Sequence, residues 1–538
     1  MAIPVIDLFA GPGGLGEGFS SVLGRDRIPV FRIKLSIEKD RHAHQTLLLR
    51  AFFRQFAKSA RPNEYYRYLA GETGAARLFN TYPQQSKAAA SEAWHAELGA
   101  SDITNDAVDK RISAATGQER QWVLLGGPPC QAYSIVGRSR LIGTGEDWRR
   151  IKDPARARAA KRAQAEKMRT YEADPRHQLY RHYLRILAIH RPPVFVMENV
   201  KGLLSAKIKD QAVFHQILDD LRRPVIATGA HTLANLEYRL VPFSAGSANL
   251  LGEFAPEDFV VRSEDYGIPQ TRHRIIILGI RADIAAKPPF LNPASHRATV
   301  DDVIADLPRI RSGLSQEFDS PQAWRDAVSA IPLTSFNGAL SRDFTDLLLR
   351  SARRLGANLN RGGRFLTARA QPRRYADWFS DSKLQGVCNH ESRGHIRSDL
   401  HRYFFAAVFA REFGRSPLLE DFPANLLPDH ENVAKALNET KFNDRFRVQM
   451  KGRPSSTVVS HISKDGHYYI HYDPSQCRSL TVREAARLQT FPDNYFFEGP
   501  RTEQYKQVGN AVPPLLAKQI AAVVAGVLQR GEVREALA

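Results

Sequence analysis

Residues 126–134 (GGPPCQAYS) constrain this chain more than any other stretch. They follow a short apolar run, residues 121–125 (QWVLL), which is typical of a buried parallel strand. The glycines and prolines end that strand, because proline cannot continue a hydrogen-bonded ladder and glycine frees the turn. Cys130 therefore lies just past the carboxyl end of a strand, where open α/β sheets bind ligands. A nearby helix N-terminus would favour its thiolate, whereas a buried structural thiol is the alternative.

Two earlier strand ends also carry ligand-type residues. Residues 3–9 (IPVIDLF) predict a buried strand, and residues 10–16 (AGPGGLG) predict a glycine turn that lets the backbone approach a nucleotide-like ligand closely. Residues 31–38 (FRIKLSIE) predict a second strand that ends at Glu38. An acid at this position can bind both hydroxyls of a ribose, and a solvent-exposed turn glutamate is the alternative.

Two later strands repeat the pattern. Residues 192–200 (PPVFVMENV) predict a strand that ends near Glu198, and residues 265–279 couple a turn to another strand. If that strand has begun by residue 270, alternation places Gln270, Arg272 and Arg274 on one face. Two arginines near a cleft suit an anion or a nucleobase, whereas solvated strand ends are the alternative.

These stretches occur in the order found in the bacterial DNA (cytosine-5)-methyltransferases, and the chain resembles that family over about residues 3–280 and 455–525. Residues 7–14 (DLFAGPGG) resemble its first motif, residues 126–134 its Pro-Cys motif, and residues 198–200 its Glu-Asn-Val motif. Residues 270–274 (QTRHR) are similar to its Gln-x-Arg-x-Arg motif. Residues 478–493 predict an amphipathic helix with a capping box at Thr481 and Glu484, similar to the ninth motif, and residues 507–514 (QVGNAVPP) resemble the last.

The resemblance implies a catalytic mechanism and a cofactor. Cys130 would add to C6 of a cytosine, Glu198 would hold or protonate N3, and Arg272 with Arg274 would position the base and favour the thiolate. The methyl donor would be S-adenosylmethionine (SAM). Carried over residue by residue, the implied cofactor contacts are Phe9, Gly11, Gly13, Glu38, Asp102, Pro129, Leu179, Asn510 and Val512.

Charge and composition agree with a nucleic-acid partner. The 538-residue chain has a formal net charge of +19, which indicates a polyanion. Its three cysteines are widely spaced, so neither a disulfide framework nor a zinc ribbon is expected. No apolar run is expected to approach the roughly 20 residues of a membrane span, and the first strand leaves no room for a signal peptide. We expect a cytoplasmic, nucleoid-associated protein that acts on double-stranded DNA as a monomer.

The middle of the chain breaks the α/β rhythm and is basic. Eight arginines and no acid lie between Asp346 and Asp377, a composition that fits phosphate contacts. The predicted DNA-binding residues are Arg350, Arg353, Arg354, Arg361, Arg364, Arg369, Arg373 and Arg374. Residues 389–395 (NHESRGH) lack a recognised metal-ligand spacing, and no metal is predicted. The basic segment 137–176, which has an N-cap at Asp153, reads equally as a solvated helix or as a DNA clamp.

The predicted fold is α/β: a Rossmann-like, SAM-dependent methyltransferase with a mixed sheet and an inserted smaller target-recognition domain. The expected divisions are residues 1–285 for the cofactor and catalysis, 286–455 for target recognition, and 456–538 for a segment that completes the first domain. A transfer-RNA cytosine-5 methyltransferase, a DNA-binding regulator with a decayed site and a nicotinamide dehydrogenase are the rival interpretations. A cognate restriction endonuclease and a solitary methylase both remain open, and the target sequence is not readable from one chain.

Overall fold

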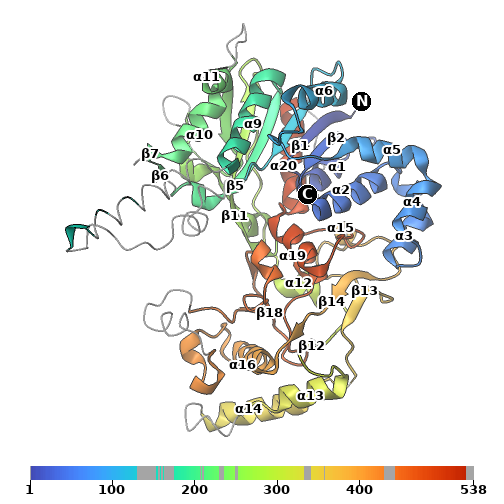
Figure 1. Ribbon diagram of the computed structural model, residues 1–538, viewed down its shortest axis with the longest axis vertical. Helices are drawn as coiled ribbons and strands as arrows, with labels where there is room; N and C mark the ends of the chain where they lie inside the picture. The colour runs from blue at the N-terminus through green and yellow to red at the C-terminus, as the bar shows by residue number, and fades with distance from the viewer. Residues whose placement is uncertain are drawn as a thin grey trace.

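The computed structural model describes residues 2–129, 153–155, 158, 162, 175–205, 207–208, 211–229, 236–246, 248, 253–332, 341–356, 358–428 and 443–528. A mixed sheet in the order β3-β2-β1-β4-β5-β11-β8, with β9 also paired to β11, forms its centre (Figure 1). The strands are β1 (Ile3–Leu8), β2 (Phe31–Glu38), β3 (Ala93–His95), β4 (Val123–Gly126), β5 (Val194–Val200), β8 (Tyr238–Pro242), β9 (Val260–Arg262) and β11 (His273–Arg281).

Strand direction decides where a ligand can bind. Strands β1 to β5 pair in parallel, whereas β11 runs antiparallel to β5, β8 and β9. The strand order reverses between β1 and β4, where Leu8 is in register with Gly126. The loops after these two residues therefore leave the sheet side by side, at the point where doubly wound sheets bind ligands. The predicted Rossmann-like mixed sheet is confirmed.

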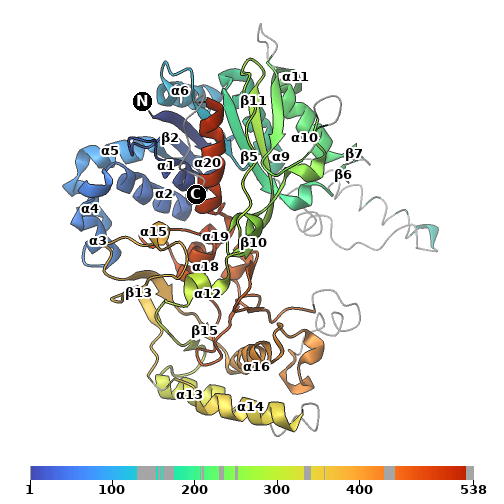
Figure 2. The same cartoon turned by 180° about the vertical axis from the view of Figure 1, so that it is seen from behind.

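Helices cover both faces of the sheet (Figures 1 and 2), and an apolar cluster lies on each face. On one face the strands pack against α6 (Asn105–Thr116), α9 (Pro175–His190) and α10 (Val213–Arg222). On the other they pack against α1 (Gly14–Ser20) and α20 (Pro514–Leu528). A Cβ at Gly18 would lie 2.4 Å from the Cβ of Ala517, so α1 and α20 touch closely. The last described helix therefore packs against the first part of the chain.

One helical stretch passes the length and composition test for a membrane span, contrary to the expectation that none would come near it. This stretch, Arg501–Leu528, has a mean hydropathy of 1.7 in its most apolar window. However, 78% of that window is buried inside the protein, as in the core helix of a soluble protein. Its apolar character is therefore explained by packing against the sheet.

Four α-helices fill the connection between β2 and β3. They are α2 (Arg41–Arg54), α3 (Asn63–Leu69), α4 (Ala75–Thr81) and α5 (Pro83–Glu92). The Asp40 side chain caps α2 by accepting from the backbone N–H groups of His42 and Ala43. An aromatic cluster joins these helices to residues of the middle region, including Phe365.

The middle region, which is drawn in the lower part of Figure 1, has a hydrophobic core of its own. There α13 (Pro321–Ser329), α14 (Arg342–Arg353) and α16 (Arg397–Phe413) pack through Phe344, Phe405 and Phe409, and β13 (Gly362–Leu366) pairs with β14 (Val387–Glu391). The boundaries at 285 and 455 stay predictions. At the second boundary, β17 (Ser455–Ser456) pairs with β10 (Gln270–Thr271).

The helix predicted for residues 478–493 is shorter than expected and is not amphipathic. Helix α18 (Val482–Leu488) has the predicted capping box at Thr481 and Glu484. All seven of its residues, the charged ones included, are buried, so no face of the helix meets solvent as that of an amphipathic surface helix would. Arg483 donates to the backbone oxygens of Cys388, Pro492 and Tyr495, and these contacts explain how its charge is buried.

Candidate active site

The loop after β1 has a backbone that is open toward the carboxyl edge of the sheet. Phe9 and Gly11 both have a φ of 57° and Gly13 a φ of 94°, all in the left-handed region. Such a conformation is strained for Phe9 and is typical of functional loops. A Cβ at Gly11 would meet nothing within 4 Å, so its exposed backbone borders free space. The predicted cofactor loop therefore offers a cradle that glycine leaves unfilled.

Glu38 closes one side of this loop. Its Oε2 accepts from the Gly11 N–H at 2.7 Å, and its Oε1 accepts from the Asp40 N–H at 2.7 Å. Burial raises the pKa of the carboxyl group, against the two hydrogen bonds, which lower it. The residue predicted from strand position to bind a ribose thus lies in direct contact with the glycine loop.

Asp7 lies beneath the loop and is not among the site residues that the sequence predicts. It is 1% exposed at the end of β1, and neither carboxylate oxygen has a hydrogen-bond partner among the described residues. Burial raises its pKa from 3.8 to about 7, with a further rise from the Glu38 charge. The sequence signal that could have identified Asp7 as a functional residue is an aspartate within an otherwise apolar strand.

The other predicted cofactor residues fall into two groups. Leu179 is buried in the cluster against which Phe9 packs, whereas Asp102 is exposed in the turn before α6. Asn510 is exposed at the end of α19 (Arg501–Asn510), and the Val512 backbone oxygen would lie 2.2 Å from a Cβ at Gly14. The C-terminal segment therefore reaches the glycine loop. Pro129, half-buried, is the last described residue before the gap that begins at Cys130.

Glu198 and Arg274 form an ion pair beside the end of β4. Arg274 Nε lies 3.1 Å from Glu198 Oε1, and the two side chains are 15% and 14% exposed. A Cβ at Gly127 would lie 3.3 Å from Glu198 Oε2, so the loop after β4 passes directly over the carboxylate. Two predicted catalytic residues are thus brought together next to the chain that leads to Cys130.

Asn199, the middle residue of the Glu-Asn-Val motif, also belongs to this site, although no role is predicted for it from the sequence. Its Nδ2 donates to the backbone oxygen of Pro128 at 3.1 Å, and its Oδ1 accepts from the Val200 N–H at 2.9 Å. The side chain is 4% exposed. It therefore ties the loop after β4 to the end of β5, one residue from Glu198.

Arg272 points elsewhere than the strand alternation suggested. It lies in the break between β10 and β11, and its guanidinium donates to the backbone oxygens of Val458 at 2.8 Å and of Gly509 at 3.3 Å. Burial, with the Arg274 charge, lowers the pKa of Arg272 to about 9, so it still carries a charge at neutral pH. Two guanidinium groups beside one carboxylate leave this corner with a net positive charge.

The cysteines differ in their surroundings. Cys388 and Cys477 are buried free thiols, and burial raises the pKa of Cys388 to about 12 and that of Cys477 well above its ordinary value. Neither can supply a thiolate near neutral pH. Cys130, the predicted nucleophile, lies outside the described residues, as do most residues of the basic segment 137–176. Within that segment the Asp153 side chain accepts from the Ala155 N–H, as its predicted N-cap role requires.

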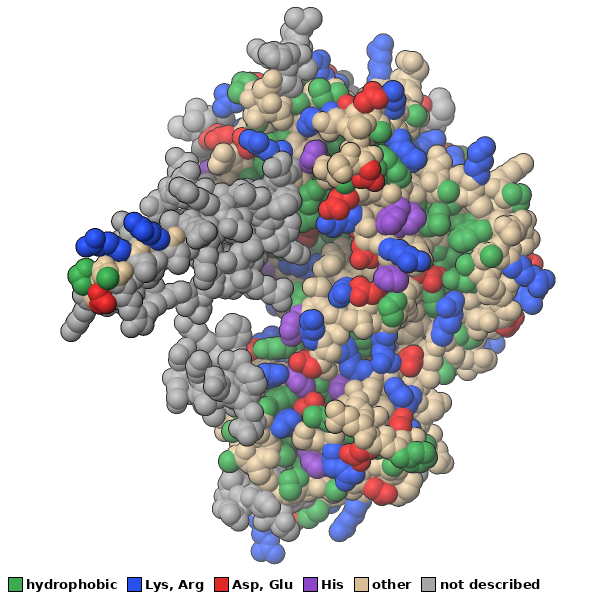
Figure 3. All heavy atoms as spheres, viewed as in Figure 1, with side chains coloured by type: hydrophobic (Ala, Val, Ile, Leu, Met, Phe, Trp, Pro, Cys, Tyr) green, Lys and Arg blue, Asp and Glu red, His purple; other side chains and the backbone are tan. Residues whose placement is uncertain are grey.

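The predicted DNA-binding arginines divide by their partners. Four have partners within the protein: Arg361 pairs with Asp319, Arg364 donates to the Tyr68 oxygen, Arg373 pairs with Asp301, and Arg374 donates to the His296 oxygen. Arg350, Arg353, Arg354 and Arg369 are exposed. On the face drawn in Figure 3, basic side chains are interspersed with acidic ones.

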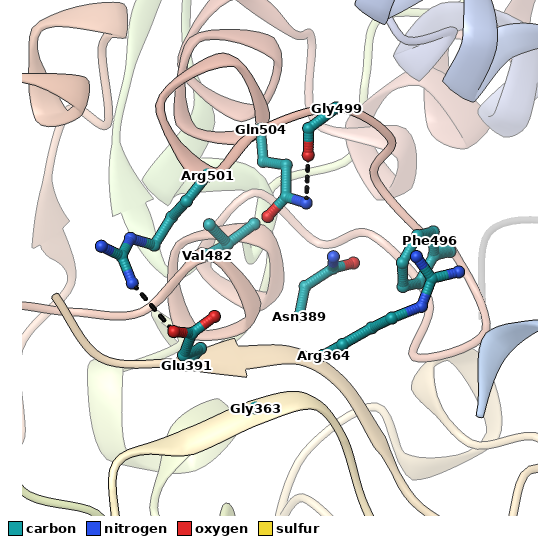
Figure 4. A pocket seen from close by; sticks show the side chains of 9 residues that line it. All are labelled: Gly363, Arg364, Asn389, Glu391, Val482, Phe496, Gly499, Arg501 and Gln504. Atoms are coloured by element: carbon teal, nitrogen blue, oxygen red, sulfur yellow. Dashed lines mark hydrogen bonds and ion pairs between the residues drawn. The ribbon is translucent and has the colours of Figure 1, made fainter. Parts of the chain in front are cut away.

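Residues 389–395 hold the middle region to the C-terminal segment. His390 Nδ1 lies 2.9 Å from the Thr481 hydroxyl oxygen, and its Nε2 lies 2.8 Å from the Pro308 backbone oxygen. Burial lowers the pKa of His390 to about 4. In the described part of the chain no group of three His, Cys, Asp or Glu side chains could hold a metal. A nearby pocket of about 200 Å³ is lined by side chains already partnered, including the pair of Arg501 and Glu391 at 3.2 Å (Figure 4).

A sheet with one antiparallel strand beside β5, a glycine loop after β1 and an acid after β2 together define a Rossmann-like methyltransferase. The pattern of the C-5 cytosine-specific DNA methylases matches residues 164–224 and 251–525. The type II methyltransferase M.Bpa9945I of Bacillus paralicheniformis is 32% identical over 97% of this chain and 99% of its own length. The chain therefore belongs to the C-5 cytosine-specific DNA methylase family.

More distant relatives agree. The DNA (cytosine-5-)-methyltransferase M.ApeKI of Aeropyrum pernix is 28% identical over 76% of this chain and 81% of its own length. The type II methyltransferase M.DdeI of Desulfomicrobium norvegicum is 25% identical over 96% of this chain and 87% of its own length. The predicted enzyme class, a DNA cytosine-5 methyltransferase, is confirmed.

Proposed function

We propose that this protein transfers a methyl group from SAM to C5 of a cytosine that has been flipped out of duplex DNA, through a transient bond between Cys130 and C6. The observation that carries the proposal is the Glu198–Arg274 pair beside Gly127, on the loop that leads into Cys130. Membership of the family supports the reaction, and the site supports the roles of the residues.

The residues around the glycine loop fit SAM. Open space beside Gly11, the Glu38 carboxyl group for a ribose, and the apolar cluster that holds Leu179 and contacts Phe9 form a cradle of the required chemistry. Asp102, Asn510, Val512 and Pro129 complete the proposed set. Bound SAM would supply an electrophilic methyl group, and the chain's own residues supply the activation of the base.

Cytosine C5 is a poor nucleophile, so the ring must be activated before it can accept a methyl group. Addition of the Cys130 thiolate to C6 makes C5 an enamine carbon, and Glu198 neutralises the charge at N3 as that bond forms. Arg274 holds the Glu198 carboxylate, and the buried charge of Arg272 adds to a field that favours the thiolate. Once C5 has gained the methyl group, loss of the C5 proton and of the Cys130 sulfur restores the aromatic ring.

A stacked base cannot reach these groups, so the target must leave the duplex, which costs a few kcal/mol. Contacts of the middle region with DNA would offset that cost, and Arg350, Arg353, Arg354 and Arg369 are its exposed candidates. The type II names of the relatives support a restriction-modification system with a cognate endonuclease encoded nearby. We propose a monomer on DNA.

Transfer of tritium from labelled SAM to duplex DNA or to transfer RNA, followed by bisulfite sequencing, tests substrate, target and position together. Duplex DNA should be labelled at cytosine C5 and transfer RNA should not. Cys130→Ser should bind DNA and SAM but transfer no methyl group. Normal turnover by that variant would refute the nucleophile, and labelling of transfer RNA alone would refute the DNA substrate.

A further inference from the structure

A tyrosine of the C-terminal segment is bonded to the middle of the glycine loop. The Tyr495 hydroxyl donates to the backbone oxygen of Pro12, between Gly11 and Gly13. The tyrosine is 0% exposed, and a Cβ at Gly13 would lie 3.0 Å from its hydroxyl oxygen. A residue 483 positions later in the chain therefore sets the direction of a peptide group in the loop.

Tyr495 is itself held firmly. The Arg50 guanidinium lies over its ring, 4.7 Å from the centroid, and Phe491 packs against it with ring centroids 4.8 Å apart. Arg50 donates to both carboxylate oxygens of Glu17 in α1 and to Asn494 Oδ1 at 2.9 Å. The hydroxyl group cannot swing away, because the ring is fixed by α1, α2 and the C-terminal segment together.

The loop is thus bonded from two sides. Glu38 accepts from the Gly11 N–H on one side, and Tyr495 donates to the Pro12 oxygen on the other. Between them the Gly13 N–H donates to the Ala10 oxygen at 2.9 Å and closes the turn. Glycine samples many backbone conformations, so these two external bonds select the one that leaves the cradle open.

We propose that Tyr495 is a positioning residue of the cofactor site, which holds the glycine loop in the shape that binds SAM. The inference rests on the proposed use of SAM. It makes cofactor affinity depend on the C-terminal segment through a hydroxyl group that touches neither the cofactor nor the base.

Tyr495→Phe removes only that hydroxyl group and tests the proposal. Loss of one buried hydrogen bond predicts that the Kd and the KM for SAM rise about five- to tenfold. The kcat at saturating SAM and the KM for DNA should change less than about twofold, because no group that touches DNA is altered. Calorimetric titration of SAM and initial rates of methyl transfer give these four values.

Tyr65→Phe is the matched control. Tyr65 is also 0% exposed, and its hydroxyl donates at 2.9 Å to the backbone oxygen of Asn494, the residue next to Tyr495, but not to the loop. This variant should lose similar thermal stability and keep the wild-type affinity for SAM. Unchanged SAM affinity in Tyr495→Phe, or an equal loss in Tyr65→Phe, would overturn the positioning role. Failure of the folded wild-type protein to bind SAM would instead overturn the proposed cofactor.

Discussion

Replacement of Asp7 by Asn should change how the stability of the protein depends on pH. Burial raises the pKa of this carboxyl group from 3.8 to about 7. Between those values the unfolded chain has lost the proton while the folded protein keeps it, so folding becomes less favourable as pH rises. Below the lower value both states are neutral, and above about 7 both are ionised and no further stability is lost.

The size of the effect follows from the two pKa values. A rise of about 3 in pKa corresponds to a cost of about 4 kcal/mol at pH 8, of which about 1.5 kcal/mol is already present at pH 5. Asparagine is neutral throughout and removes this dependence, although its amide adds a constant cost if it lacks partners. The free energy of unfolding of Asp7→Asn relative to wild type should therefore increase by about 2–3 kcal/mol between pH 5 and pH 8.

The thermal midpoints of the two proteins are measured from pH 5 to pH 8. The midpoint of Asp7→Asn should rise by a few degrees relative to that of wild type over this range. Asp109→Asn is the control for sign. Burial raises the pKa of Asp109, but hydrogen bonds from Arg185 and His190 outweigh it and lower the pKa below its ordinary value. The Asp109 carboxyl group is ionised in both states over this range, so Asp109→Asn should not reproduce the rise in relative stability with pH that is predicted for Asp7→Asn. Parallel profiles of Asp7→Asn and wild type would refute the account of Asp7.

Four other outcomes follow from the site and its surroundings. Glu198→Gln should slow methyl transfer by about 10²- to 10⁴-fold with SAM affinity unchanged in titration, because only transition-state charge is affected. Asn199→Ala should lower kcat with little change in the KM for SAM, because it frees the Pro128 oxygen rather than the glycine loop. In anisotropy titrations Arg353→Ala should weaken DNA binding and reduce the slope of log affinity against log salt concentration by about one. Arg364→Ala should instead lower the thermal midpoint, because Arg364 donates to the Tyr68 backbone oxygen inside the protein. Because burial lowers the pKa of His390 to about 4, the stability that this residue contributes should be lost as pH drops from about 6.5 toward 4, so the thermal midpoint of His390→Gln should rise relative to wild type over that range.

The sequence predicts the elements whose signals are local. Strands β1, β2, β4 and β5 are short and rich in apolar residues, and each begins and ends within about two residues of its predicted place. The chain order of these ends, together with the switch point between β1 and β4, is enough to place Glu38 and Glu198 at the same edge of the sheet.

Contacts between distant segments have no such signal. The sequence predicts an amphipathic helix around α18, but its charges lie inside the protein, where Arg487 pairs with Asp306 and Asp493 and Arg478 pairs with Glu484. Likewise, nothing near Tyr495 indicates that its hydroxyl reaches Pro12. A buried charge or hydroxyl group is stable only with partners, and the sequence does not state which distant residues those partners are.

Hydrogen bonds between the middle region and the rest of the chain depend little on the residue type of one of the two partners. Many of them run from a side chain on one part to a backbone oxygen on the other: Arg364 to Tyr68, Tyr375 to Gly267, and Arg483 to Cys388. Every residue carries a backbone oxygen, so Cys388 or its neighbours can change while Arg483 keeps its partner. The aromatic core around Phe344 is separate from the clusters that cover the sheet. Exposed residues of the middle region can therefore change without moving the glycine loop or the Glu198–Arg274 pair.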